Sequence, residues 1–213
     1  MNDFFTISIG DRLCNVTKIR REIVVAEALA LLDEAGLDGV STRQLAKRLG
    51  VEQPTLYHYF RTKRDLLAAL AEAAMAPHAT APLPAPGDDW RAWFLDNTRN
   101  FRRTLLTHRD GARLHAGSAP TGDMERIRHK MAFLVTSGVP ERDAQMAMLA
   151  ASRFTVGSVL EEQADTGPGM DLPPDIPAID HESAFEAGLA LILAGLARAL
   201  DPADPSRESG PAT

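Results

Sequence analysis

Apolar residues recur at intervals of three and four along almost the whole chain, and this spacing constrains the fold more than any other feature. Ile19, Ile23, Ala26 and Ala30 begin the pattern, which stops at Gly36 and resumes in later segments. An interval of three to four places one face of an α-helix toward a core, whereas a half-buried strand alternates with a period of two. The sequence shows neither a strand pattern nor an internal repeat. We therefore predict an all-α protein.

The composition is that of a globular protein. Apolar residues make up 45% of the 213 residues, which is enough for a sizeable core. The single cysteine, Cys14, excludes an internal disulfide and a cysteine-based zinc site. The first residues lack the basic start of a signal peptide, and the longest uncharged apolar run, 187–197, is shorter than the roughly 20 residues of a membrane helix. We expect a cytoplasmic protein with no membrane partner.

The net charge of −6 conceals an uneven distribution of charge along the chain. Residues 41–64 contain six basic side chains and one acidic side chain, whereas residues 73–213 contain 13 basic and 19 acidic side chains. A compact basic segment is typical of a surface that binds nucleic acid. The chain is therefore predicted to carry a small anion-binding head on an acidic body.

Within the basic segment, the turn signals predict a helix-turn-helix. Ser41 and Gln44 form a capping pair that begins a short helix, and Gly50 ends it. Pro54 then lies in the first turn of a second helix. Two short helices joined by a tight turn place the second helix in the major groove of DNA.

The side chains on and beside the second helix have the chemistry needed for DNA. Gln53 can bind adenine and Arg43 can bind guanine through paired hydrogen bonds, while Pro54 or Tyr57 can pack on a thymine methyl group. Hydroxyl groups and positive charge suit the phosphates, and these are supplied by Thr42, Thr55, Tyr59 and Lys63. A purely structural helical hairpin would leave the exposed aromatic and basic run at 57–63 unexplained, so we favour DNA binding.

A proline-rich stretch, residues 77–87, divides the chain and is predicted to be a connector. Pro77 is expected to end or kink the helix before it. The predicted organisation is an N-terminal extension, a DNA-binding head, the connector, a ligand-binding and dimerisation core, and a tail, at residues 1–15, 16–76, 77–87, 88–200 and 201–213.

The head sequence VSTRQLAKRLGVEQPTLYHYFRTKRDLLAAL resembles the DNA-binding domain of the TetR family of bacterial repressors. FRRTLLTHRDGARLHAG at 101–117 and FTVGSVLEEQ at 154–163 are similar to the tetracycline-repressor branch of that family. The resemblance implies a ligand-responsive repressor that binds a palindromic operator as a homodimer and is released by a small molecule. For this branch, the implied effector is a tetracycline-like compound bound together with Mg²⁺. An unrelated, non-chelating effector remains the alternative.

The resemblance also implies roles for individual residues. His58 joins the DNA contacts named above. The implied effector-binding residues are His78, Asn97, Phe101, His115, Ser118, Pro120, Lys130, Met131, Gln145 and Met148. His115 would ligate the magnesium, and Glu161 of the partner subunit would hold one of its waters. Lys130 stands where the family has a glutamine and Ala79 where it has a histidine, so the polar end of the effector site is altered, with His78 as a substitute. Met131 and Met148 suit a plain core equally well.

Other features have simpler interpretations. His108, with Arg109 and Asp110, is predicted to form a structural polar cluster where head and core meet. The segments 141–164 and 181–200 are predicted to pair with their copies as a four-helix bundle, with Leu189 and Ile192 at the interface and Gly188, Ala194 and Gly195 permitting close approach.

The sequence gives no support for catalysis. It has no nucleophile elbow, P-loop or dinucleotide-binding turn, and it lacks the two Glu-x-x-His pairs that a helical metalloenzyme would need. An enzyme is therefore not predicted. Beside the repressor and the enzyme, a third hypothesis is a helical interaction module that has lost DNA binding.

Overall fold

The structure is a computed structural model that describes residues 20–118, 123–165, 180–198 and 200. Within these ranges it contains helices and no strands, as the apolar spacing predicts. The expected N-terminal extension (1–15), the tail (201–213) and Pro120 lie outside the described residues. The helices are α1 (Arg21–Gly39), α2 (Thr42–Leu49), α3 (Gln53–Leu56), α4 (Lys63–Ala79), α5 (Trp90–Leu106), α6 (Gly111–Ala116), α7 (Met124–Thr136), α8 (Glu141–Asp165) and α9 (His181–Arg198).

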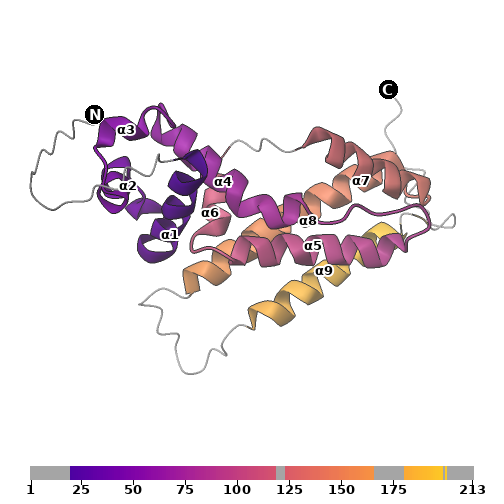
Figure 1. The fold of residues 1–213 in the computed structure, drawn as a ribbon. Helices are drawn as coiled ribbons and strands as arrows, with labels where there is room; N and C mark the ends of the chain where they lie inside the picture. Colours follow the sequence, from indigo (N-terminus) through magenta and orange to yellow (C-terminus); the bar gives the residue numbers. More distant parts are fainter. Residues whose placement is uncertain (1–19, 119–122, 166–179, 199, 201–213) are drawn as a thin grey trace, which may run out of the picture.

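Helices α1 to α3 and the first half of α4 form the head around one apolar cluster (Figure 1). Ser41 caps α2 by accepting a hydrogen bond from the backbone N–H of Gln44, and Gly50 ends the helix with a φ of 66°. Leu45 and Leu56 are fully buried between the helices. The residues from which the helix-turn-helix was predicted therefore lie at its helix ends in the structure.

Helix α4 connects the head to the core. It begins with a capping box in which the side chains of Thr62 and Asp65 bond to each other's backbone N–H groups. The helix continues through Pro77 to Ala79 and therefore ends later than the proline pattern indicated. A proline this close to a helix end removes only one hydrogen bond, and the next N–H groups still bond, because Thr80 donates to the carbonyl of Ala76.

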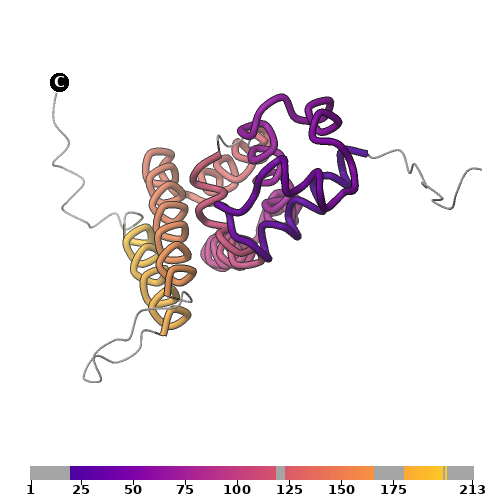
Figure 2. Tube along the Cα trace, turned by 90° about the vertical axis from the view of Figure 1, so that its left-hand side faces the viewer, coloured from indigo at the N-terminus to yellow at the C-terminus, as the bar shows by residue number. Residues whose placement is uncertain are grey.

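Helices α5, α7, α8 and α9 form the core around a second apolar cluster that includes Trp90, Phe94 and Phe185. Helix α8 packs against α5, α6, α7 and α9. In Figure 2, α8 and α9 stand side by side on the face of the molecule away from the head. No helix in the described ranges is long and apolar enough to cross a membrane.

The packing of α8 on α9 corrects the expectation for Leu189 and Gly188. Leu189 is completely buried within a single chain, so it belongs to the chain's own core. A Cβ atom added at Gly188 would lie 2.4 Å from the ring of Phe154, which stacks on Phe185. The missing side chain of Gly188 therefore permits close packing of α9 on α8 in the same chain. A glycine in the sequence indicates that another helix packs closely at this position, but it does not identify that helix.

Helix α6 joins the core to the head. Its Leu114 is 2% exposed and lies in the apolar cluster of the head. His108, just before α6, contacts the carboxylate of Asp33 on α1 at 3.0 Å, and the backbone N–H of Arg109 donates to the same carboxylate. The predicted polar cluster at the junction of head and core is therefore present.

Candidate DNA-binding surface and effector site

The turn between α2 and α3 fixes the orientation of Gln53. Its side-chain amide N–H donates to the hydroxyl of Thr42 at 2.9 Å and to that of Tyr57 at 3.3 Å. These two contacts leave the amide oxygen available and hold the side chain at the start of α3. A side chain fixed in this way loses little conformational freedom when it binds a base edge.

The other residues predicted to contact DNA also belong to the head and differ in their exposure. Exposed positions are those of Arg43, Pro54, Tyr57, His58 and Lys63, and half-buried positions are those of Thr42, Thr55 and Tyr59. Tyr59 packs against the apolar cluster of the head, so its ring is partly structural.

One basic residue of the head is neutralised within the chain, which sequence reasoning missed. Arg48 forms ion pairs with Glu27 at 2.7 Å and with Glu34, both on α1. The basic segment therefore presents less charge to DNA than its composition suggests.

In the core, an aromatic cluster brings three predicted effector residues together. The ring centroid of Phe101 lies 5.2 Å from that of His78, which is tilted, and 5.2 Å from that of His115, which is edge-on. These residues come from α5, α4 and α6 respectively, so the aromatic cluster lies where three helices meet. The side chain of His78 is thus turned into the core.

Side-chain amides on α5 contact two polar side chains near this aromatic cluster. Nδ1 of His78 lies 2.9 Å from the amide oxygen of Asn100, and the ammonium group of Lys130 donates to the amide oxygen of Asn97 at 2.7 Å. Arg126, one helical turn before Lys130, donates to the backbone carbonyl of Ala81. Sequence reasoning missed Asn100 and Arg126, although Asn100 lies one turn from Asn97 on the same helix.

The environment favours the neutral form of these groups. Burial, followed by the positive charge of Lys130, lowers the pKa of His78 to about 4. Burial, followed by the charge of Arg126, lowers the pKa of Lys130 to about 8. Burial also lowers the pKa of His115. Neither ring nitrogen of His115 has a hydrogen-bond partner among the described residues, so an uncharged imidazole is left free to bind a ligand.

A hollow of about 430 Å³ lies between α6 and α8, with His115 and Ser118 on one side. Ser118 is held by a hydrogen bond to the backbone carbonyl of Leu114 at 2.8 Å. The wall from α8 consists of Ser152, Arg153, Val156, Gly157 and Leu160.

The remaining predicted residues differ in how far they are buried. Met131 and Met148 are half-buried against the core cluster of Trp90 and Phe94, and Gln145 and Glu161 are exposed on α8. In the part of the chain that the structure describes, no three His, Cys, Asp or Glu side chains gather to hold a metal ion. A metal bound at His115 therefore needs further ligands from outside this set.

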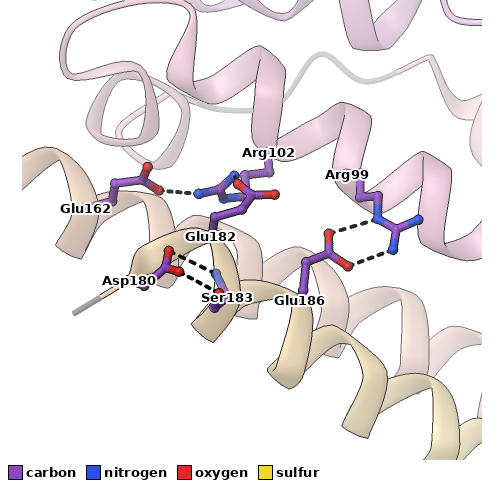
Figure 3. Close-up of polar contacts among 7 residues, drawn as sticks. All are labelled: Arg99, Arg102, Glu162, Asp180, Glu182, Ser183 and Glu186. Atoms are coloured by element: carbon purple, nitrogen blue, oxygen red, sulfur yellow. Dashed lines mark hydrogen bonds and ion pairs between the residues drawn. The ribbon is translucent and has the colours of Figure 1, made fainter.

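Two arginines tie α5 to α8 and α9 (Figure 3). Arg102, which is 5% exposed, binds Glu162 at 2.8 Å and also Glu182, while its guanidinium lies over the ring of Phe185. Arg99 forms a double hydrogen bond with Glu186. Glu162 thus has a structural partner.

A helix-turn-helix head joined through a shared helix to an all-helical core with a polar interior site defines a transcriptional regulator controlled by a ligand. The comparisons with known proteins identify its family. A model described as "Bacterial regulatory proteins, tetR family" matches residues 24–70, and one described as "Tetracyclin repressor-like, C-terminal domain" matches residues 83–175.

Individual relatives agree with the family models. The class A tetracycline repressor protein of transposon 1721, from Escherichia coli, is 46% identical over 86% of this chain and 93% of its own. A structure of a TetR-family transcriptional regulator from Streptomyces coelicolor is 71% identical, with a TM-score of 0.69, and covers 85% of this chain and 100% of its own. A structure of class A TetR with 5a,6-anhydrotetracycline and magnesium is 46% identical, with a TM-score of 0.69, and covers 82% of this chain and 96% of its own.

The chain therefore belongs to the TetR family of transcriptional regulators, close to the tetracycline repressors. It is a ligand-responsive repressor.

Proposed function

We propose that this repressor binds a palindromic operator as a homodimer in the cytoplasm and releases it when a tetracycline-like, Mg²⁺-chelating effector enters the core. The observation that carries the proposal is the position of His115. His115 lines a hollow of about 430 Å³, and its ring nitrogens have no hydrogen-bond partner among the described residues. Partial burial lowers the pKa of this imidazole, and the neutral form that this favours suits a metal ligand.

The residues present fit a magnesium ion that arrives with its effector. Mg²⁺ prefers oxygen ligands and keeps several waters, so one imidazole supplied by His115 is enough when a chelating effector supplies the oxygens. His115 would hold the ion from α6, and the ion would supply the positive charge that binds the effector's oxygens. Glu161 is exposed on α8 and free to reach a neighbouring copy, where it would hold a metal-bound water.

The dimer would form through α8 and α9. Three large apolar side chains on these helices are exposed in a single chain: Met146 (52%), Leu149 (40%) and Leu191 (75%). Exposed apolar residues on two adjacent helices favour pairing with a second copy. A two-fold dimer also matches DNA recognition, because one short helix reads few bases and a palindrome doubles the contacts.

The mechanism we infer runs through α6, where neighbouring residues serve different parts of the protein. His115 touches the effector site, and Leu114 lies in the apolar cluster of the head. An effector that pulls on His115 would favour a position of α6 that moves the head, so that the two heads of a dimer no longer fit successive major grooves. This coupling can be no larger than the difference between the effector's affinities for the two states.

The direct test is stabilisation by candidate effectors. Tetracycline and anhydrotetracycline should raise the melting temperature in the presence of Mg²⁺, and EDTA should remove most of the increase. Stabilisation that is the same with EDTA would favour the alternative, a TetR-family repressor with a non-chelating effector.

A further inference from the structure

Four nitrogen-bearing side chains, with no acid among them, lie near one another, and the rings of two of them, His78 and His115, contact Phe101. His78 comes from α4, His115 from α6, and Arg126 and Lys130 from α7; His78 lies within electrostatic range of the other three. Among the described residues, none of these four side chains forms an ion pair with a carboxylate. The lowered pKa of His78 and of His115 favours their neutral forms, so the positive charge of this part of the effector site comes from Arg126 and Lys130.

Elsewhere this chain neutralises its buried or half-buried cations. Arg102 has two carboxylate partners, and Arg99 pairs with Glu186. Among the described residues, the half-buried ammonium group of Lys130 has one partner, the neutral amide oxygen of Asn97, at 2.7 Å. An ammonium group has three donors, so this single amide leaves its charge and its remaining N–H bonds without a partner from the described residues. Burying an unpaired charge costs free energy. We therefore expect a bound molecule to supply the missing negative charge.

The lowered pKa of Lys130 agrees with the absence of a counter-charge, because burial and Arg126 both oppose its protonated form. Lys130 is nevertheless protonated near neutral pH, since that pKa is about 8. An anion brought to this point would hold the ammonium in its charged form.

We propose that the effector places an anionic oxygen group, a carboxylate or a deprotonated enol, against Lys130 at the Asn97 end of the site. The same charges would disfavour a protonated amine there. This inference rests on the proposed function, because it concerns the effector of the same site. The inference restricts the effector to molecules with an acidic group. It does not depend on whether His115 binds a metal.

The test compares an acid with its uncharged counterpart. The probes are a dihydroxyanthraquinone carboxylic acid, its primary carboxamide, and smaller aromatic acids with their amides, measured by thermal shift and isothermal titration. The proteins are the full-length wild type, Lys130→Gln and Arg128→Gln, the last being a control that removes an exposed charge from the same helix. We expect the wild type and Arg128→Gln to prefer an acid over its amide by about tenfold or more, because hydrogen bonds to charged groups are the strong ones. Lys130→Gln should bind the two equally.

Three results would overturn the inference. These are equal binding of acid and amide by the wild type, a preference for the acid that persists in Lys130→Gln, or no binding of any acid in the set. Release of operator DNA, measured separately, distinguishes this inference from the proposed function. An acid that binds through Lys130 but leaves the operator complex intact supports the anion site and contradicts its role as effector. Release by tetracycline that is equal in the wild type and Lys130→Gln supports the proposed function and contradicts the anion site.

Discussion

The carboxylate of Asp110, at the start of α6, accepts a hydrogen bond of 2.7 Å from the backbone N–H of Leu37 in the head. The contact is close because the chain turns at Gly36, where φ is 72° and an added Cβ would lie 3.0 Å from the same carboxylate. This bond joins the helix that carries His115 to the end of α1. It is therefore a direct link between effector site and DNA-binding head.

Removing this link should weaken communication between the two sites. We expect Asp110→Ala to lower the free energy of unfolding by about 1–3 kcal/mol, because the Leu37 N–H loses its partner. The effector should still bind, but release of the operator should need more of it. Asp110→Asn is the matched control, since asparagine tolerates the same left-handed backbone and keeps one acceptor oxygen. Equal loss of coupling in both variants would show that the charge of Asp110, and not the bond to Leu37, matters.

The fixed position of Gln53 predicts sequence-specific DNA recognition. Gln53→Ala should weaken operator binding by about 1–3 kcal/mol and relax the preference at one base pair. Lys63→Ala, which removes a phosphate contact, should weaken binding to all duplexes alike and reduce the salt dependence. Titration of operators with single base substitutions checks both. If the two variants lose affinity equally on every duplex, Gln53 does not read a base.

The exposed face of α9 predicts where the dimer forms. Leu191→Glu should give folded monomers that bind the operator poorly, because an unpaired charge would be buried in an apolar interface. Ala132→Glu adds the same charge at an exposed position on α7 and should leave the dimer intact. Sedimentation equilibrium distinguishes the two. A stable dimer of Leu191→Glu would place the interface on another surface.

Acid should destabilise the fold through His78. Its pKa is about 4 in the folded protein and about 6.5 when unfolded, so only the unfolded chain binds a proton between these values. The contribution of His78 to the free energy of unfolding is therefore complete above about pH 6.5. It is lost as the pH drops toward 4, which lowers the free energy of unfolding by at most roughly 3 kcal/mol. The groups that face His78 are Lys130, Arg126 and His115.

Denaturant unfolding between pH 7 and 4 measures this loss. His78→Gln should flatten the dependence, whereas His58→Gln, which changes an exposed imidazole, should retain the wild-type slope. The same slope in all three proteins would mean that His78 is accessible to protons when folded.

The local features of the fold could be predicted from the sequence because their signals are short-range. Ser41 with Gln44, Gly50, and Thr62 with Asp65 lie within a few residues of one another, and each sets a helix end in the structure. The exception is Pro77, which removes one hydrogen bond near the end of α4 without stopping it. His108 was also placed correctly, because its neighbours Arg109 and Asp110 made a polar cluster the simplest interpretation.

Contacts between distant segments could not be predicted in this way. Arg102 meets Glu182 eighty residues later, and no spacing rule relates the two. Leu189 and Gly188 have the composition of an interface, but they serve the packing of α9 on α8 within one chain. Lys130 beside Asn97 also depends on the tertiary fold, which places α7 against α5.

The most direct test of the account is release of operator DNA by tetracycline in the wild type, His115→Ala and Glu161→Gln. Fluorescence anisotropy of an operator duplex, selected by the protein from a random pool, is followed in Mg²⁺ and in EDTA, with each protein compared with its own operator complex. We expect release of the operator to require Mg²⁺ and to be almost abolished in His115→Ala. Glu161→Gln should still release the operator but should need more effector, because a water-linked carboxylate contributes less than a direct ligand. Release by the wild type in EDTA, equalled by His115→Ala, would contradict the metal-chelate account.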